Sequence, residues 1–382
     1  MTHDDPLTIG KGKRRCLRTD LHVALVYNVK KEDETGVPAV TETEAHKPRR
    51  NNGDVATLSR PALTGDDTYA EWDTIETIHA VESALKQQNR VSLIEANDRI
   101  FTRLVELRPD IVFNIAEGLR GPSREAQVPA MLEFLGIPYT GSDPLTLAVC
   151  LDKARAKEIL SYHSIPTPSF LVVENPDEVS SLSFSLPAIV KPLHEGSSKG
   201  VFDASVVRTQ DELRSQVQRV LGTYHEPALV EQFLTGREFT VAMLGNGKSV
   251  RVLPLLETRF DRLPPGANHI YSYEAKWLWD TLDDPLDIHE CPANVTPELA
   301  ASIEDVCRRT FNVLKCRDWT RIDVRLDDQD IPHIIELNPL PGILPNPEEH
   351  SAFPQAARAA GIEYNTMLNL VLETAVQRYG LQ

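Results

Sequence analysis

Four polar side chains near the end of the chain stand within two short apolar runs. Arg321 and Asp323 alternate with isoleucine and valine in the first run, and Glu336 and Asn338 lie among isoleucine, leucine and proline in the second. A carboxylate without a partner is costly to bury in such surroundings. Oxygen ligands suit Mg²⁺, which one or two carboxylates commonly hold together with a phosphate. The pattern therefore indicates a Mg²⁺ site that binds a nucleotide.

A lysine and a glycine-serine loop follow another apolar run. Lys191 lies near the end of the run 187–192, and the segment 195–200 continues as Glu-Gly-Ser-Ser-Lys-Gly. Backbone N–H groups and hydroxyls of such a loop can surround a phosphate. The lysine precedes the glycines, so this is not the GxxxxGK[ST] phosphate loop. A plain glycine-serine hairpin would explain the glycines alone, but the lysine and the downstream carboxylates favour phosphate binding.

The run 228–234 continues into Thr-Gly-Arg-Glu and reads as a strand beside an adenosine site. In that interpretation the backbone of residues 231–234 faces the adenine edge, and a glutamate accepts the ribose hydroxyls. Solvated or ion-paired side chains are the alternative for Glu231 and Glu238.

The elements that must hold these groups alternate between strands and helices. Apolar runs predict strands at 21–27, 91–94 and 110–114, and helical spacing predicts a helix at 74–88. This alternation predicts an α/β domain with a parallel sheet over residues 20–143. Residues 1–19 are expected to form a loose tail, and residues 29–70 a long mobile insertion.

Two α+β subdomains, 144–233 and 234–382, are expected beyond the turn-rich segment 137–144. The first contains predicted helices through 153–157 and at 209–221. The second contains strands near 239–244 and 250–256, the two runs with the polar groups, and helices near 297–314 and 364–378. The irregular segment 257–280 is the candidate cover over the site.

Composition narrows the range of partners. The chain has 382 residues and a formal net charge of −16, which argues against nucleic-acid and anionic-membrane binding. No apolar run approaches a membrane span, and the first residues lack the core of a secretion signal. The five cysteines are scattered, as in reduced cytoplasmic proteins. We therefore expect a cytoplasmic protein with small-molecule substrates.

Five motifs in series resemble the ATP-grasp superfamily, and its D-alanine–D-alanine ligase branch in particular. They are Lys191 with EGSS-x-G, then EQFL-x-GREFTV, YEAK, RIDVRLD and IIELNPLPG. The resemblance covers residues 110–382, and more weakly 21–109. It implies an ATP-dependent carboxylate–amine ligase that forms a dipeptide through an acyl phosphate, in peptidoglycan precursor synthesis. ATP would lie between the two subdomains, and a homodimer is expected because relatives usually form one.

The resemblance also implies roles for individual residues. Phosphate contacts would come from Lys153, Lys191, Lys276 and the loop residues Glu195, Ser197 and Ser198. Glu231, Gln232 and Leu234 would hold adenine, and Glu238 the ribose. Asp323, Glu336 and Asn338 would bind two Mg²⁺ ions, for which Mn²⁺ could substitute. The catalytic group would comprise Arg321, Ser197, Gly342 and Glu71. Glu71 would also hold the amine of the first substrate, and Ser351 the carboxylate of the second.

The amino-acid half departs from the family pattern. The first strand is not followed by a glycine pair, and Glu71 could instead serve the start of a helix. Trp277 stands where the family commonly has tyrosine, and an indole donates but does not accept. A short insertion precedes Ser351. Two alternatives stay open: a ligase for another amino acid or a specialised metabolite, and a nucleotide-binding regulatory protein without turnover.

Overall fold

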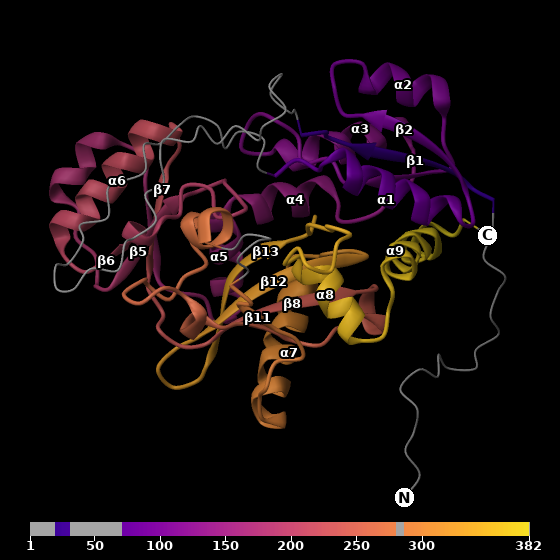
Figure 1. Ribbon diagram of the computed structural model, residues 1–382. Coiled ribbons are helices and arrows are strands. Elements are labelled where there is room, and N and C mark those ends of the chain that lie inside the picture. Colours follow the sequence, from indigo (N-terminus) through magenta and orange to yellow (C-terminus); the bar gives the residue numbers. More distant parts are fainter. Residues whose placement is uncertain (1–19, 31–70, 280–285, 382) are drawn as a thin grey trace, which may run out of the picture.

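The computed structural model describes residues 20–30, 71–279 and 286–381. The expected tail at 1–19 and most of the expected insertion at 29–70 lie outside these residues. The described residues form three sheets, one parallel and two antiparallel (Figure 1).

The first sheet is parallel, in the order β2-β1-β3, as the strand–helix alternation predicts. Its strands are β1 (His22–Tyr27), β2 (Arg90–Glu95) and β3 (Ile111–Asn114), and its helices are α1 (Ile75–Lys86), α2 (Ile100–Leu107) and α3 (Gln127–Leu135). β3 is buried throughout, as is the middle of β1, because helices cover both faces of the sheet. Helices α2 and α3 were not predicted from the sequence.

The second sheet is antiparallel, in the order β4-β7-β5-β6. Its strands are β4 (Phe170–Val173), β5 (Ala188–Pro192), β6 (Val206–Val207) and β7 (Ala228–Gln232), with α6 (Gln210–Tyr224) packed on one face. Two helices precede it, α4 (Pro144–Leu151) and α5 (Lys153–Tyr162). The side chain of Asp143 caps the N-terminus of α4, and that of Asp152 caps the N-terminus of α5. Asp152 has an extended backbone, so the two helices are separate.

The third sheet carries the predicted metal strands. Its order is β11-β10-β8-β12-β13, with β9 paired to β8. The strands are β8 (Glu238–Leu244), β9 (Arg251–Val252), β10 (Leu256–Thr258), β11 (His289–Glu290), β12 (Trp319–Leu326) and β13 (Pro332–Asn338). The predicted single strand at 250–256 is wrong, because β9 and β10 are separate strands. Pro254 lies between them and has no N–H to donate to a ladder.

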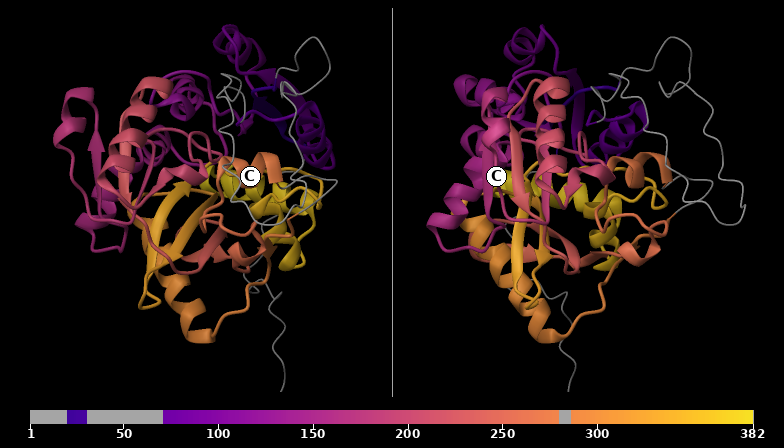
Figure 2. Two further views of the ribbon diagram at one scale, coloured as in Figure 1. Left: turned by 60° about the vertical axis from the view of Figure 1, so that its left-hand side comes forward. Right: turned by 90° about the vertical axis from the view of Figure 1, so that its left-hand side faces the viewer.

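Helix α7 (Pro297–Val313) covers one face of this third sheet, at the bottom of the molecule in Figures 1 and 2. Phe239, Val241 and Met243 of β8 pack in the same cluster as α7. Because side chains alternate along a strand, Thr240 and Glu238 face the other side. Toward the Glu238 end of β8, that other face carries the candidate site, where Thr240 lies opposite Asp323.

The last two helices are α8 (Ala352–Ala359) and α9 (Tyr364–Tyr379). α9 lies beside α1, although the second and third sheets lie between them in the sequence (Figure 1). Asn369 Nδ2 donates to Ala84 O at 2.9 Å across this contact. Among the described residues, no helix is both long and apolar enough to cross a membrane.

Candidate functional site

The polar groups of β12 and β13 share one face of the third sheet. Arg321 lies opposite Asn338, and Asp323 lies opposite Glu336, in the antiparallel register. Directly opposed residues point to the same face, so the predicted set is brought together. A register shift follows Asp323, and such irregularities commonly re-aim side chains at sites.

Cations neutralise the two carboxylates. Arg321 Nη2 lies 2.9 Å from Asp323 Oδ2 and 3.9 Å from Glu336 Oε1. Lys153 Nζ lies 3.7 Å from Glu336 Oε2. Burial raises the pKa of Asp323, and Arg321 offsets this only in part. Burial also opposes ionisation of Glu336, but Lys153, Lys191 and Arg321 together hold its pKa below the ordinary value.

The donor set fits Mg²⁺ better than a metal held by protein groups alone. No three His, Cys, Asp or Glu side chains gather around a metal position in the part of the chain that the structure describes. Asp323 and Glu336 supply two carboxylates, and Asn338 supplies an amide oxygen, on one face. Mg²⁺ commonly takes one or two carboxylates and completes its coordination with water and phosphate. Two half-buried carboxylates on one face, still reachable from solvent, suit such an ion.

The glycine-serine loop has an unusual backbone. Ser197 and Ser198 have φ values of 50° and 60°, in the left-handed region that non-glycine residues rarely adopt. Ser198 Oγ donates to Tyr271 O at 2.8 Å, and Tyr273 N donates to Val201 O at 2.7 Å. Residues held in such conformations cluster at active sites and ligand-binding loops. The two hydrogen bonds with Tyr271 and Tyr273 bring part of the expected cover, 257–280, directly against the loop.

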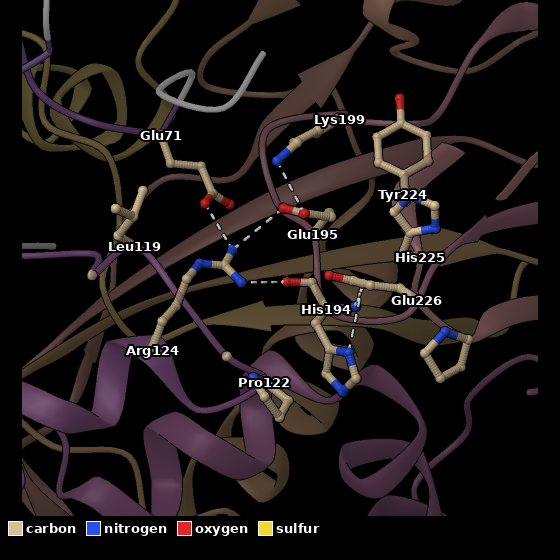
Figure 3. A pocket seen from close by; sticks show the side chains of 13 residues that line it. Glu71, Leu119, Pro122, Arg124, His194, Glu195, Lys199, Tyr224, His225 and Glu226 are labelled. Atoms are coloured by element: carbon tan, nitrogen blue, oxygen red, sulfur yellow. Dashed lines mark hydrogen bonds and ion pairs between the residues drawn. The ribbon is translucent and has the colours of Figure 1, made fainter. Parts of the chain in front are cut away.

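The N-terminal part of the chain contacts the same loop through Glu71 and Arg124 (Figure 3). Glu71 Oε1 accepts from Gly196 N at 2.9 Å, and Arg124 Nη2 donates to Glu71 Oε2 at 2.7 Å. Arg124 also donates to His194 O at 2.9 Å and lies 3.6 Å from Glu195. Both Glu71 oxygens thus have partners, so an amine at Glu71 would share it with Arg124.

The alternative role for Glu71, at the start of a helix, is excluded. Thr74 caps α1, and its hydroxyl accepts from Thr77 N. Glu71 lies before this cap and points toward the glycine-serine loop. Arg124 was not predicted from the sequence because it stands in a short 3-10 helix and belongs to no motif.

A cavity of about 410 Å³ adjoins this contact (Figure 3). The loop around Gly118 and Arg124 forms one side, and residues 194–199 and 224–227 form the other. His194 lies 3.7 Å from Asp152 and 3.5 Å from Glu226. Burial opposes its protonation, but these two carboxylates raise the pKa of His194 to about 9. The cavity wall is thus built from paired charges.

Glu231 lies inside a cluster of buried charges on β7. It is 1% exposed, and its two oxygens lie 2.7 Å from Lys157 Nζ and 2.5 Å from Lys191 Nζ. Burial would raise the pKa of Glu231, but the two lysines lower it to about 2. Glu231 is therefore an ion-paired glutamate, which was the alternative interpretation of its sequence. The adenine role, through the neighbouring backbone of Gln232 and Leu234, stays a prediction.

Lys157 was missed, although a signal existed. It stands four residues after Lys153 on α5, and residues at that spacing share a helix face. Lys153 Nζ donates to Glu195 O at 2.6 Å, so both lysines point from one helix toward the site. Spacing along a predicted helix could have added Lys157 to the set.

Two other predicted nucleotide groups lie on the same side. Glu238 of β8 accepts from Arg325 Nη1 at 2.9 Å, and burial raises the pKa of Glu238. Lys276 belongs to the cover segment, and burial together with Arg321 lowers its pKa to about 8. The side chain of Trp277 lies outside what the structure describes.

Ser351, predicted for the second substrate, is hydrogen-bonded to Gly342, which was predicted for the catalytic group. Ser351 Oγ donates to Gly342 O at 3.0 Å and accepts from Leu344 N at 3.2 Å. The hydroxyl thus closes the loop between β13 and α8. A carboxylate role for Ser351 stays a prediction, and it would require the hydroxyl to change partner.

Sequence comparisons relate the chain to one family of enzymes. Residues 159–373 match the family model described as D-ala D-ala ligase C-terminus. The chain is 34% identical over 317 residues to the uncharacterized protein y4sG of Sinorhizobium fredii, which covers 81% of this chain and 90% of that protein. It is 32% identical over 337 residues to D-alanine–D-alanine ligase of Pelotomaculum thermopropionicum, with 85% and 99% covered.

Solved structures give the same relationship. The crystal structure of D-alanine–D-alanine ligase from Bacillus anthracis aligns with a TM-score of 0.66 and 25% identity, over 94% of this chain and 99% of that one. The structure of that ligase with ATP aligns with a TM-score of 0.62 at 24% identity, again over 94% and 99%. The likeness confirms the expected ATP-grasp fold, whereas the subdomain boundaries at 143 and 233 stay predictions.

Proposed function

We propose, from the premise that this chain belongs to the D-alanine–D-alanine ligase family of ATP-dependent ligases, that it joins two amino acids into a dipeptide. ATP would phosphorylate the carboxylate of the first amino acid, and the amine of the second would displace phosphate. D-Alanyl-D-alanine is the default product, as a precursor of peptidoglycan. The placement of Arg321, Asp323, Glu336 and Asn338 on one face, with Lys153 beside them, carries this proposal.

The residue types suit phosphoryl transfer, which needs charge neutralisation and positioning more than a covalent nucleophile. Asp323, Glu336 and Asn338 would hold Mg²⁺, which would neutralise the transferring phosphoryl group. Lys153 and Lys191 would orient the ATP phosphates. Arg321, with its planar fork, would hold the oxyanion that forms when the amine attacks the acyl carbon.

Excluding water is the second requirement, because an acyl phosphate hydrolyses readily. The contacts of Ser198 with Tyr271 and of Val201 with Tyr273 support segment 257–280 as the cover. A closed cover of this kind would protect the intermediate and complete the site.

A ligase for a different amino acid or a specialised metabolite is the second candidate. The pairing of Glu71 with Arg124 favours it, because an arginine already neutralises the carboxylate that would hold the first amine. A substrate with a different group at this position would then be preferred to D-alanine.

Phosphate release from Mg·ATP across a panel of D- and L-amino acids tests the proposal. Release with D-alanine alone, with the dipeptide detected by mass spectrometry, would support the default product. Strong release with another acid and amine, but none with D-alanine, would establish the second candidate. ATP binding without release for any amino acid would contradict the default product and leave the specialised-metabolite and regulatory interpretations.

A matched pair of variants ties any release to the metal set. Asp323→Asn removes one carboxylate, and we expect turnover to fall at least about 100-fold because charge neutralisation at the phosphoryl group is lost. Asp328→Asn, in the exposed hairpin between β12 and β13, should retain the wild-type rate. Equal rates for the two variants would refute the role of Asp323.

A further inference from the structure

Lys157 is a fully buried ammonium group that no part of the proposed reaction uses. It is 1% exposed, and its Nζ donates to Thr167 Oγ1 and to Ile335 O, each at 2.9 Å. Its third neighbour is Glu231 Oε1 at 2.7 Å, an ion pair without the alignment of a hydrogen bond. A longer hydrogen bond, of 3.4 Å, runs from Nζ to Ile334 O. The three donors of the ammonium group therefore all have acceptors.

Lys157 and its neighbours Glu231 and Ile335 belong to different parts of the fold. Glu231 lies on β7 in the second sheet, and its other oxygen pairs with Lys191 Nζ at 2.5 Å. Ile335 lies on β13 in the third sheet, immediately before Glu336. Lys157 itself lies on α5, one helical turn after Lys153. One side chain therefore joins the strand of the proposed adenosine site to the strand of the proposed metal site.

Removing this ammonium would disturb both ends of the connection. The Glu231 oxygen that it neutralises would be left buried without a partner, which is costly. Lys191, the nearest remaining cation, would then be drawn fully onto Glu231 and away from a phosphate. The carbonyl before Glu336 would lose its donor, and β13 would lose a contact with α5.

We propose that Lys157 is a positioning residue for Mg·ATP, which acts by fixing Glu231, and with it Lys191, relative to the metal strand. The proposal rests on the proposed function for the identity of the ligand. Lys157 contacts Glu231, Thr167 and Ile335 and would touch no reacting atom. Replacing Lys157 should therefore weaken nucleotide binding by more than a loss of folding stability alone would cause.

The test measures the Kd of a non-hydrolysable ATP analogue with Mg²⁺ by calorimetry, alongside thermal unfolding. Lys157→Met should weaken binding about 10- to 100-fold, the range found when groups that orient ligands are removed. Arg155→Met is the matched control, because Arg155 lies on the same helix with its side chain exposed and paired with Glu158. It should bind the analogue like the wild type.

A second variant covers the case in which Lys157→Met does not fold. Lys157→Arg keeps the charge, but a planar fork cannot match three acceptors arranged around an ammonium. We expect it to fold and to show a raised KM for ATP, with the KM for the amino acids unchanged. A purely structural role predicts lower stability with both KM values unchanged. Wild-type analogue affinity in every folded variant at Lys157 would overturn the proposal.

The readout separates this proposal from the proposed function. A wild-type protein that binds the analogue but releases no phosphate with any amino acid contradicts the ligase proposal only. The role of Lys157 is then judged on the Kd values alone. A wild-type protein that does not bind the analogue at all would overturn both.

Discussion

At the scale of single residues, the charge and position of each candidate functional group depend on its partners within the protein. Glu231 and Glu71 are both carboxylates predicted to meet a ligand, and each has cationic or N–H partners within the protein. Glu231 is held between two buried lysines and has a pKa of about 2. Such paired charges fix the geometry of a site before any ligand binds, and breaking one pair leaves the other charge unsatisfied.

His194 offers a test of such pairing by pH. Its pKa is raised to about 9 from the ordinary 6.5, because Asp152 and Glu226 outweigh the effect of burial. A raised pKa in the folded state stabilises the protein fully below pH 6.5, and this contribution disappears as the pH rises through about 9. His194→Gln should therefore lower the free energy of unfolding on the acidic side of this window and not on the alkaline side.

Urea unfolding on both sides of the window measures the effect of His194→Gln. His79→Gln is the control, since His79 is exposed on α1 and should tolerate the change at either pH. A loss of stability for His194→Gln that is the same at both pH values would show that packing, rather than charge, accounts for it.

At the scale of elements, apolar runs predicted β1, β2, β3, β5, β7, β8, β12 and β13, and the sequence pattern predicted α1, α5, α6, α7 and α9. The run 250–256 forms two strands in place of the one predicted, and β4, β6 and β11 were not predicted individually. The helices α2, α3, α4 and α8 were missed, because they are short and begin within segments rich in turn residues. Alternation along β12 and β13 predicted the set around Asp323. Arg124 could not be predicted from local pattern, because its contacts with Glu71 and His194 join elements that are far apart in the sequence. The spacing from Lys153 could have indicated Lys157, but not its contacts with Glu231 and Ile335.

The contact between Glu71 and the glycine-serine loop predicts a requirement for glycine at position 196. A Cβ at Gly196 would lie 2.4 Å from Glu71 Oε1, which is closer than atoms can approach. Gly196→Ala should displace the loop or Glu71, and misplacement on this scale lowers turnover by about 100-fold. Glu71→Asp in the same chain shortens the opposing side chain and should restore part of the rate.

A glycine outside the site provides the matched control. Gly222 lies in α6 with open space around its Cβ position, and Gly222→Ala should leave turnover unchanged. The change should also stabilise the helix by up to about 1 kcal/mol. Wild-type turnover in Gly196→Ala would contradict the loop contact.

At the scale of the whole molecule, one hydrophobic core joins the two ends of the chain. β1 and α1 share a cluster with Trp319, with α8 and with α9. Asp318, 0% exposed, lies beside this core and accepts from Gly141 N at 2.8 Å, from Asn246 Nδ2 at 2.7 Å and from Arg378 Nη2 at 2.7 Å. These donors belong to the segment before α4, to the turn after β8 and to α9. One carboxylate thus joins regions that the sequence placed in separate domains.

Asp318→Asn tests whether these regions unfold as one unit. Asp318 has a φ of 64°, a conformation that asparagine also tolerates, so the change removes the charge without straining the backbone. Loss of a buried partner for Arg378 should cost about 3–5 kcal/mol in the free energy of unfolding, in a single urea transition. Asp330→Asn is the control, because Asp330 has a φ of 58° but is exposed. If Asp318→Asn instead splits the transition into two, the shared core does not couple the N-terminal sheet to the C-terminal helices, and the predicted boundary near 143 separates independent units.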